Sequence, residues 1–203
     1  MQMGFGQSKK ERFDMSRWPQ EQLRRAREKA DAHELCSDRE KEVIYYCNLV
    51  RVNGPLFEKT ILQQYLDAGG YSGDMSYVNS LKNDLRKLPV DEMPMFEYNE
   101  KLFQTSKKYA IEGGKKGIVG HDGFSKRMKY FYNHFNCIAE NCSYGDEDGF
   151  DAFMSLLIDE GIVGLGHRQN LLNKDHVFAS AAFAPHKKYE VNMVMDFACM
   201  QRD

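Results

Sequence analysis

Three short stretches of the chain carry residue types that can bind a metal or move a proton. The run Gly166-His167-Arg168 follows a glycine-rich approach over residues 161–166 and opens a predicted helix. His121 lies in a second glycine-rich loop, and the run Ala139-Glu140-Asn141 puts a carboxylate on a predicted strand. We expect these three stretches to form the walls of one cleft.

Each histidine has a structural and a chemical interpretation. His167 stands at a helix N-terminus, where the helix dipole disfavours imidazolium, so its ring tends to stay neutral. A neutral imidazole can bind a divalent metal or accept a proton. The alternatives are a helix-capping role for His167 and an ordinary surface position for His121.

Glu140 interrupts an otherwise apolar strand, and a charge in that place needs a partner. Either Arg168 or a histidine could supply one. Two histidines and a carboxylate fit a zinc site that keeps an open position. The sequence contains neither the H-E-x-x-H zinc-protease motif nor the G-x-S-x-G setting of serine hydrolases. It also lacks a phosphate-binding glycine loop of the Walker or dinucleotide type.

Helices come first along the chain and strands come last. A capping box at Ser37 and Glu40 opens the first strongly apolar helix, and apolar residues at helical spacing predict another helix over residues 150–158. Strands are expected over residues 135–143, 177–184 and 189–197. Helices followed by an antiparallel hairpin predict a layered α+β domain.

Composition limits the possible partners and locations. The chain has 203 residues, 42 % hydrophobic residues and a formal net charge of -2, so nothing in its balance favours nucleic acid. We expect neither a transmembrane segment nor a visible signal peptide. The five cysteines leave at least one thiol unpaired. Buried free cysteines are the simplest interpretation, and one disulfide is the alternative if the protein is exported.

The chain is predicted to have two parts. Residues 1–36 form a strongly charged N-terminal arm with a polar helical centre, and residues 37–203 form the folded domain. The boundary lies near Cys36.

Taken together, several runs resemble the bacterial branch of the CAP superfamily. This superfamily, also called SCP-like, comprises cysteine-rich secretory, antigen 5 and plant pathogenesis-related proteins. The resemblance covers about residues 37–199. The runs that carry it are Glu42-Val43-Ile44 through Asn48-Leu49-Val50-Arg51, Asn99-Glu100-Lys101-Leu102, Gly120-His121-Asp122-Gly123-Phe124, Ala139-Glu140-Asn141, Leu156-Leu157-Ile158-Asp159-Glu160-Gly161 and Gly166-His167-Arg168-Gln169-Asn170-Leu171-Leu172.

The resemblance implies an α-β-α sandwich with a small antiparallel sheet between helical layers. It also implies a cleft with two histidines and two acids. His121 and His167 match the histidines and Glu140 matches the acid of the Glu-Asn motif. The second acid of the family falls near Leu156 in this chain, so Asp159 or Glu160 would have to replace it. Family members are mostly exported and bind divalent cations at the histidines.

Three functions follow as hypotheses. The first is an extracellular or periplasmic binding domain that holds a divalent metal, zinc by preference, through His121 and His167, while Glu140 orients a ring or a water. Its unknown ligand would contact Asn141, Asp159, Glu160 or Arg168. The second is a metal-dependent peptidase or esterase in which Glu140, His121 and His167 are catalytic. The third is a protein- or lipid-interaction module that uses the basic arm.

Overall fold

The computed structural model describes residues 12–202 and is built around a three-stranded antiparallel sheet. Strands β1 (Ile138–Tyr144), β2 (Phe178–His186) and β3 (Glu190–Ala198) lie in the order β1-β3-β2. The last two strands form the predicted hairpin, and β3 pairs on its other side with β1. The strand nearest the C-terminus is therefore the centre of the sheet.

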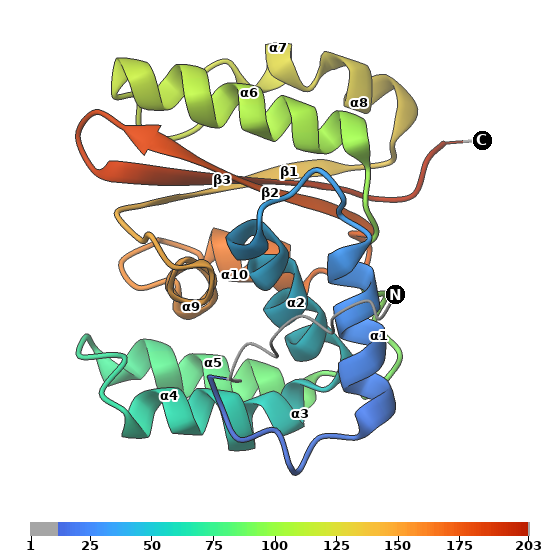
Figure 1. The fold of residues 1–203 in the computed structure, drawn as a ribbon, viewed down its shortest axis with the longest axis vertical. Coiled ribbons are helices and arrows are strands. Elements are labelled where there is room, and N and C mark those ends of the chain that lie inside the picture. Colours follow the sequence, from blue (N-terminus) through green and yellow to red (C-terminus); the bar gives the residue numbers. More distant parts are fainter. Residues whose placement is uncertain (1–11, 203) are drawn as a thin grey trace, which may run out of the picture.

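Helices cover both faces of this sheet (Figure 1). On one face lie α6 (Glu100–Lys116), α7 (Phe124–Arg127) and α8 (Lys129–His134). On the other lie α2 (Asp38–Val52), α9 (Gly149–Ile158) and α10 (Gly166–Leu172). The predicted α+β architecture, an α-β-α sandwich with a small antiparallel sheet between helical layers, is confirmed.

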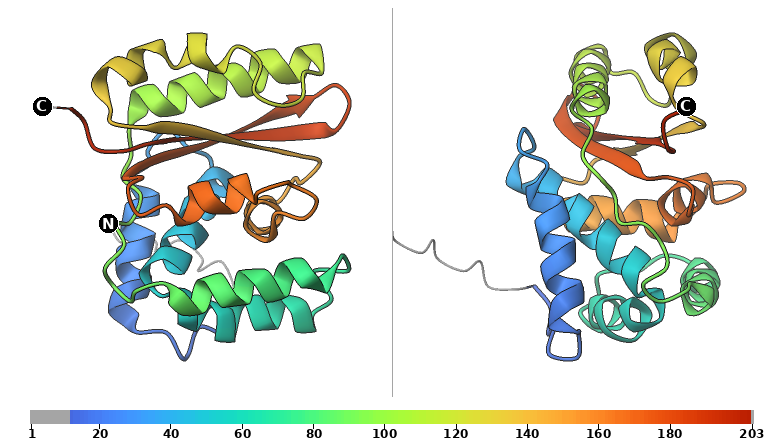
Figure 2. Two further views of the ribbon diagram at one scale, coloured as in Figure 1. Left: turned by 180° about the vertical axis from the view of Figure 1, so that it is seen from behind. Right: turned by 90° about the vertical axis from the view of Figure 1, so that its right-hand side faces the viewer.

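A further group of helices lies beyond α2 and α9. It consists of α3 (Gly54–Phe57), the π-helical turn η1 (Glu58–Leu62), α4 (Gln63–Asp67) and α5 (Met75–Lys87). Figure 2 shows this group from behind and from the side, at the end of the molecule opposite α6. Because α2 is enclosed between the sheet and these helices, every residue of α2 from Val43 onward is buried.

The face of β3 that carries polar residues is also covered. Asn192 and Asp196 alternate with apolar residues, a pattern that would suit a strand with one face in water. In the structure α6 packs over this face, and Asp196 is 0 % exposed. A carboxyl group is thus enclosed between the sheet and α6.

The described part of the N-terminal arm packs on the rest of the chain. Helix α1 (Gln20–Asp31) lies along α2 and buries Ala26 and Ala30 in the same hydrophobic core. Trp18 is buried, and its Nε1 donates a hydrogen bond of 3.0 Å to Thr60 Oγ1. The division of the chain at residue 36 stays a prediction.

The cysteines divide into one pair and three free thiols. Cys137 and Cys199 form a disulfide, whereas Cys36, Cys47 and Cys142 are free and buried. The two alternatives predicted from the sequence, buried free cysteines and one disulfide, therefore both occur in this chain. Within residues 12–202, every helix is too short or too polar to cross a lipid bilayer.

Candidate metal-binding site

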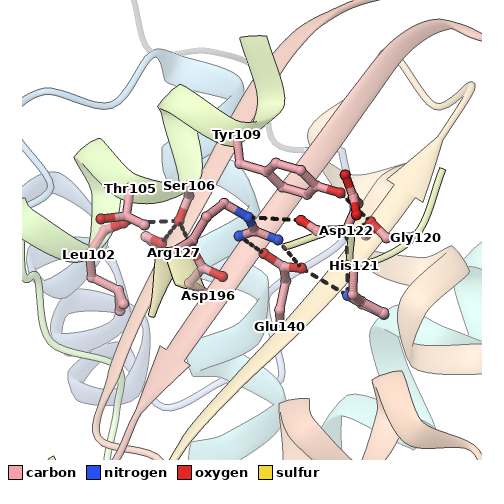
Figure 3. A network of polar contacts seen from close by, with 12 residues as sticks. Leu102, Thr105, Ser106, Tyr109, Gly120, His121, Asp122, Arg127, Glu140 and Asp196 are labelled. Atoms are coloured by element: carbon pink, nitrogen blue, oxygen red, sulfur yellow. Dashed lines mark hydrogen bonds and ion pairs between the residues drawn. The ribbon is translucent and has the colours of Figure 1, made fainter. Parts of the chain in front are cut away.

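Glu140 on β1 holds the ring of His121. Its carboxylate is 1 % exposed, and Oε1 lies 2.8 Å from His121 Nδ1 (Figure 3). Arg127 at the end of α7 donates two hydrogen bonds to the same carboxylate, from Nη1 to Oε2 at 2.7 Å and from Nη2 to Oε1 at 3.0 Å. The partners of Glu140 are therefore a histidine and Arg127, and the predicted alternative of Arg168 is wrong.

The loop that carries His121 is tied down from both sides. Tyr109 of α6 donates a hydrogen bond of 2.7 Å from its hydroxyl to Gly120 O, and Gly120 N donates one of 2.8 Å to the hydroxyl of Tyr144. The Arg127 guanidinium lies 3.5 Å from the centroid of the Tyr109 ring. These contacts position the loop, while the His121 side chain itself is 48 % exposed.

The charge state of Glu140 fixes the tautomer of His121. Burial alone would raise the pKa of Glu140, but hydrogen bonds from His121 and Arg127 lower it below its ordinary value. An ionised carboxylate only accepts hydrogen bonds, so His121 Nδ1 must carry the proton. In the neutral ring, Nε2 then keeps its lone pair.

A second carboxylate holds His167 in the same way. Asp159 caps the C-terminus of α9, is 1 % exposed, and places Oδ1 2.8 Å from His167 Nδ1. Its Oδ2 accepts a hydrogen bond of 3.1 Å from the backbone N–H of Arg168. Of the two acids considered as replacements for the missing family acid, Asp159 is the one that reaches a histidine.

The neighbour of Glu140 on β1 anchors the second histidine. Asn141 donates a hydrogen bond of 3.0 Å from Nδ2 to His167 O, and its Oδ1 accepts one of 2.8 Å from Asn170. Successive side chains of a strand point to opposite faces. Strand β1 is an edge strand, and two of its adjacent residues each anchor one histidine: Glu140 contacts the His121 ring, and Asn141 fixes the backbone at His167.

Asp196 lies beside the candidate site and was not among the residues predicted from the sequence. It is the cross-strand neighbour of Glu140 and of Ser180, so these side chains share the sheet face under α6. Its Oδ2 lies 2.6 Å from Ser106 Oγ (Figure 3). The only available signal was a single Asp within an alternating strand.

Burial and the neighbouring negative charge of Glu140 raise the pKa of Asp196 well above its ordinary value. The raised pKa favours the protonated, neutral form of Asp196 in the folded chain. Glu140 forms an ion pair with Arg127, and the Asp196 carboxyl lies beside Glu140 on the neighbouring strand.

Two residues predicted to contact a ligand, the buried Arg168 and the exposed Glu160, hold neighbouring segments of the chain together. The Arg168 guanidinium is 2 % exposed and donates to backbone oxygens of Leu157, Ile158 and Tyr77. Glu160 accepts hydrogen bonds from the Tyr71 hydroxyl and from Asp74 N. Arg168 joins α10 to α9 and α5, and Glu160 joins the segment after α9 to the loop before α5. Contact of either residue with a ligand stays a prediction.

Cys142 lies close to His121 but does not complete a catalytic pair. Its Sγ is 3.9 Å from Nδ1, the same nitrogen that faces Glu140. Burial raises the pKa of the Cys142 thiol, which keeps it protonated and weakly nucleophilic. Ligand atoms of His121, Glu140 and Cys142 lie within 4.8 Å of one another, and within residues 12–202 His167 belongs to no such group of three.

Comparison with known proteins yields likeness only at the level of solved structures. No protein-family model matches the chain, and no curated protein matches it. One similar structure is an extracellular protein containing a SCP domain from Bacillus anthracis, with 18 % identity and a TM-score of 0.43 over 53 % of this chain. A second is an outer surface protein from Borrelia burgdorferi, with 18 % identity and a TM-score of 0.46 over 65 % of this chain and 98 % of that one.

A third is a cysteine-rich secretory protein from Staphylococcus aureus, with 15 % identity and a TM-score of 0.40 over 61 % of this chain. The chain spans 34 % of the length of the Bacillus protein and 37 % of the Staphylococcus protein. At such low identity and TM-scores, only the side chains described above bear on the function.

Proposed function

We propose that this protein binds a divalent cation, zinc by preference, through Nε2 of His121 and Nε2 of His167. The observation that carries the proposal is the pair of histidine–carboxylate contacts, each 2.8 Å long and each made at Nδ1. Metal-binding histidines in proteins commonly donate their other ring N–H to a carboxylate, which fixes the ring and raises its basicity.

The donor set fits a borderline-soft dication. Neutral imidazole nitrogens suit zinc, and two protein ligands leave coordination positions for water or for a bound molecule. A bound zinc ion would supply Lewis acidity at those open positions. The residues of this chain orient the two rings: Glu140 and Asp159 act through hydrogen bonds, and Asn141 fixes the backbone at His167.

The arrangement supports binding more than hydrolysis. In the hydrolase hypothesis Glu140 would take a proton from a metal-bound water. Both of its oxygens are already engaged by Arg127, and one also faces His121. The lowered pKa of Glu140 makes it a weak base as well. We therefore propose that the open coordination positions of the metal bind a small molecule, a lipid or a protein, and that no hydrolysis takes place there.

We also propose that the protein is exported. The Cys137–Cys199 disulfide supports this location, because disulfides persist mainly in oxidising environments outside the cytosol.

Zinc titration by calorimetry tests the proposed function. Wild type should bind zinc, and the His121→Ala, His167→Ala double variant should lose that binding while it stays folded by circular dichroism. Glu160→Gln is the matched control, since this acid adjoins Asp159 but contacts neither ring. Folded wild type that binds no zinc would contradict the proposal. Zinc-loaded wild type that cleaves peptides or esters, with loss of cleavage in the double variant, would favour the hydrolase.

A further inference from the structure

A second set of soft ligands lies at one end of the sheet, away from Glu140. Cys137 comes just before β1 and Cys199 just after β3, and Cys199 N donates a hydrogen bond of 3.0 Å to Cys137 O. His176 belongs to the segment before β2, where Val177 N donates a hydrogen bond of 2.9 Å to Ala198 O. Backbone pairing therefore holds all three residues together independently of the disulfide.

The ring of His176 is prepared to act as a ligand. It is 2 % exposed and stacks on Phe197, with 5.2 Å between the ring centroids and 19° between the planes. Its Nδ1 lies 2.9 Å from Asn170 O, and a carbonyl only accepts, so Nδ1 carries the proton. Nε2 then keeps its lone pair, and Asn173 Nδ2 lies 3.5 Å from it.

One ligand atom from each of Cys137, His176 and Cys199 lies within 4.8 Å of the other two. Two thiolates and one imidazole form a set that zinc uses in proteins, with a fourth position left for water. Cys137 is only half-buried, which gives a metal ion access to the site, while the other two residues are buried.

We infer that Cys137, Cys199 and His176 form a redox-gated site for a thiophilic divalent cation such as zinc, separate from the His121 and His167 site. In the oxidised chain the two sulfurs are bonded to each other and cannot bind the ion. A dithiol reductant transfers two electrons and two protons to the disulfide, which gives two thiols and the oxidised dithiol. Binding of the dication then releases both thiol protons and forms two metal–sulfur bonds.

With this site, reduction of the disulfide would not remove the cross-link at this end of the sheet. Oxidised protein joins the start of β1 to the end of β3 through the disulfide, and reduced protein joins the same two points and the segment before β2 through the metal. The sheet end would stay cross-linked in both states. The site therefore suits a chain that meets reducing conditions before it meets oxidising ones.

Cobalt(II) spectroscopy tests the inference, because thiolate ligation gives an intense charge-transfer band in the near ultraviolet and imidazole ligation does not. Wild type reduced with a phosphine should show this band on cobalt addition, and zinc should displace it. Oxidised wild type should show none. Cys199→Ser should abolish the band, and His176→Gln should weaken cobalt affinity at least tenfold.

Matched controls use the buried thiols outside the site. Cys47→Ser and Cys142→Ser should keep the band, and circular dichroism should show that each variant is folded. The inference is overturned if reduced, folded wild type gives no band, or if the band survives Cys199→Ser and disappears in Cys142→Ser. A reduced chain that stays unfolded with or without cobalt also overturns it.

Discussion

At the scale of single residues, the site consists of two histidines, each held by one acid. Glu140 has a second partner in Arg127, whereas Asp159 combines its contact to His167 with a helix-capping contact to the backbone. The two rings therefore have the same tautomer, but the acids that hold them have different further contacts: Arg127 for Glu140 and the backbone of Arg168 for Asp159. Removing either acid should weaken metal binding without touching a ligand atom.

Replacing Asp159 with glycine is the cleanest truncation. Asp159 has a φ of 60°, a conformation that glycine adopts without strain, so the backbone should be retained. Loss of the carboxylate frees the His167 ring, and zinc affinity should fall roughly tenfold to a hundredfold. Calorimetry of Asp159→Gly against Glu160→Gln measures the effect. Unchanged affinity in folded Asp159→Gly would show that this acid does not orient the ring.

Replacing Asp196 with asparagine tests its neutral state. An acid with a raised pKa is favoured in its protonated form by folding, so it stabilises the fold below its unfolded-state pKa. That contribution is lost as the pH rises toward the folded-state value. Asp196→Asn stays neutral at every pH, so its stability relative to wild type should increase from about pH 4 to neutral pH.

Urea denaturation across this range measures the difference. The exposed Asp67→Asn is the control and should show no such trend. A constant difference between Asp196→Asn and wild type would mean that Asp196 is ionised in the fold.

The residue types predicted His121, Glu140 and His167 as candidates, because a histidine in a glycine-rich loop and a charge in an apolar strand are local signals. They did not reveal Arg127 or Asp196. These residues meet Glu140 only through the packing of α7 and through strand register, which link positions far apart in the sequence. The same limit led the sequence reasoning to offer Arg168 as a partner, although its guanidinium is enclosed elsewhere.

At the scale of elements, β1 and α6 determine how the site is assembled. Helix α6 covers the face of the sheet that carries Glu140 and Asp196, and its last turn packs on the β2–β3 turn. Close approach there depends on a glycine. A Cβ atom on Gly114 would lie 2.2 Å from Pro185 O, whereas one on Gly113 would make an ordinary contact of 3.4 Å with Tyr109.

Two adjacent alanine substitutions should therefore act in opposite directions. Gly114→Ala forces backbone to move and should lower the free energy of unfolding by about 1–3 kcal/mol. Gly113→Ala gains helix propensity and should raise it by up to about 1 kcal/mol. Chemical denaturation compares both with wild type. Equal effects of the two substitutions would contradict the packing described for the end of α6.

The sequence predicted which segments are helices or strands more accurately than it predicted the residues at which they begin and end. Periodicity predicted the hairpin and the amphipathic helices, and β1 begins three residues later than expected, at Ile138. The residues before it, which include half of the disulfide, pair with the C-terminal segment instead. Such pairing depends on where the two chain segments meet, which local pattern does not encode.

At the scale of the whole molecule, α1 is attached through a contact that acid should weaken. His33 follows α1, is 0 % exposed, and packs its ring 5.0 Å from that of Tyr98. Neither ring nitrogen has a hydrogen-bond partner among the described residues. Burial, followed by the charge of Lys41, lowers the pKa of His33 from 6.5 to about 4.

The lowered pKa predicts a loss of stability in acid. Unfolded chain takes up the proton near pH 6.5 and folded chain only near pH 4, so stability is full above the first value and falls between the two. The loss from this group should be about 3 kcal/mol. His33→Phe keeps an aromatic ring without a titratable nitrogen and should remove this loss of stability in acid. His134→Phe, at an exposed position, should leave the loss unchanged. Urea denaturation at neutral pH and near pH 4 compares them, and parallel acid losses in His33→Phe and wild type would contradict the assignment.

The central claim, two histidines held as one tautomer with Nε2 available for a metal, is tested most directly by nitrogen-15 NMR of the imidazole rings. Without metal at neutral pH, His121 and His167 should both show the tautomer protonated at Nδ1. Zinc should shift the Nε2 resonances of these two rings together, and His134 should serve as the unaffected reference. Nε2-protonated rings, or a zinc titration that leaves both Nε2 resonances in place, would contradict the account.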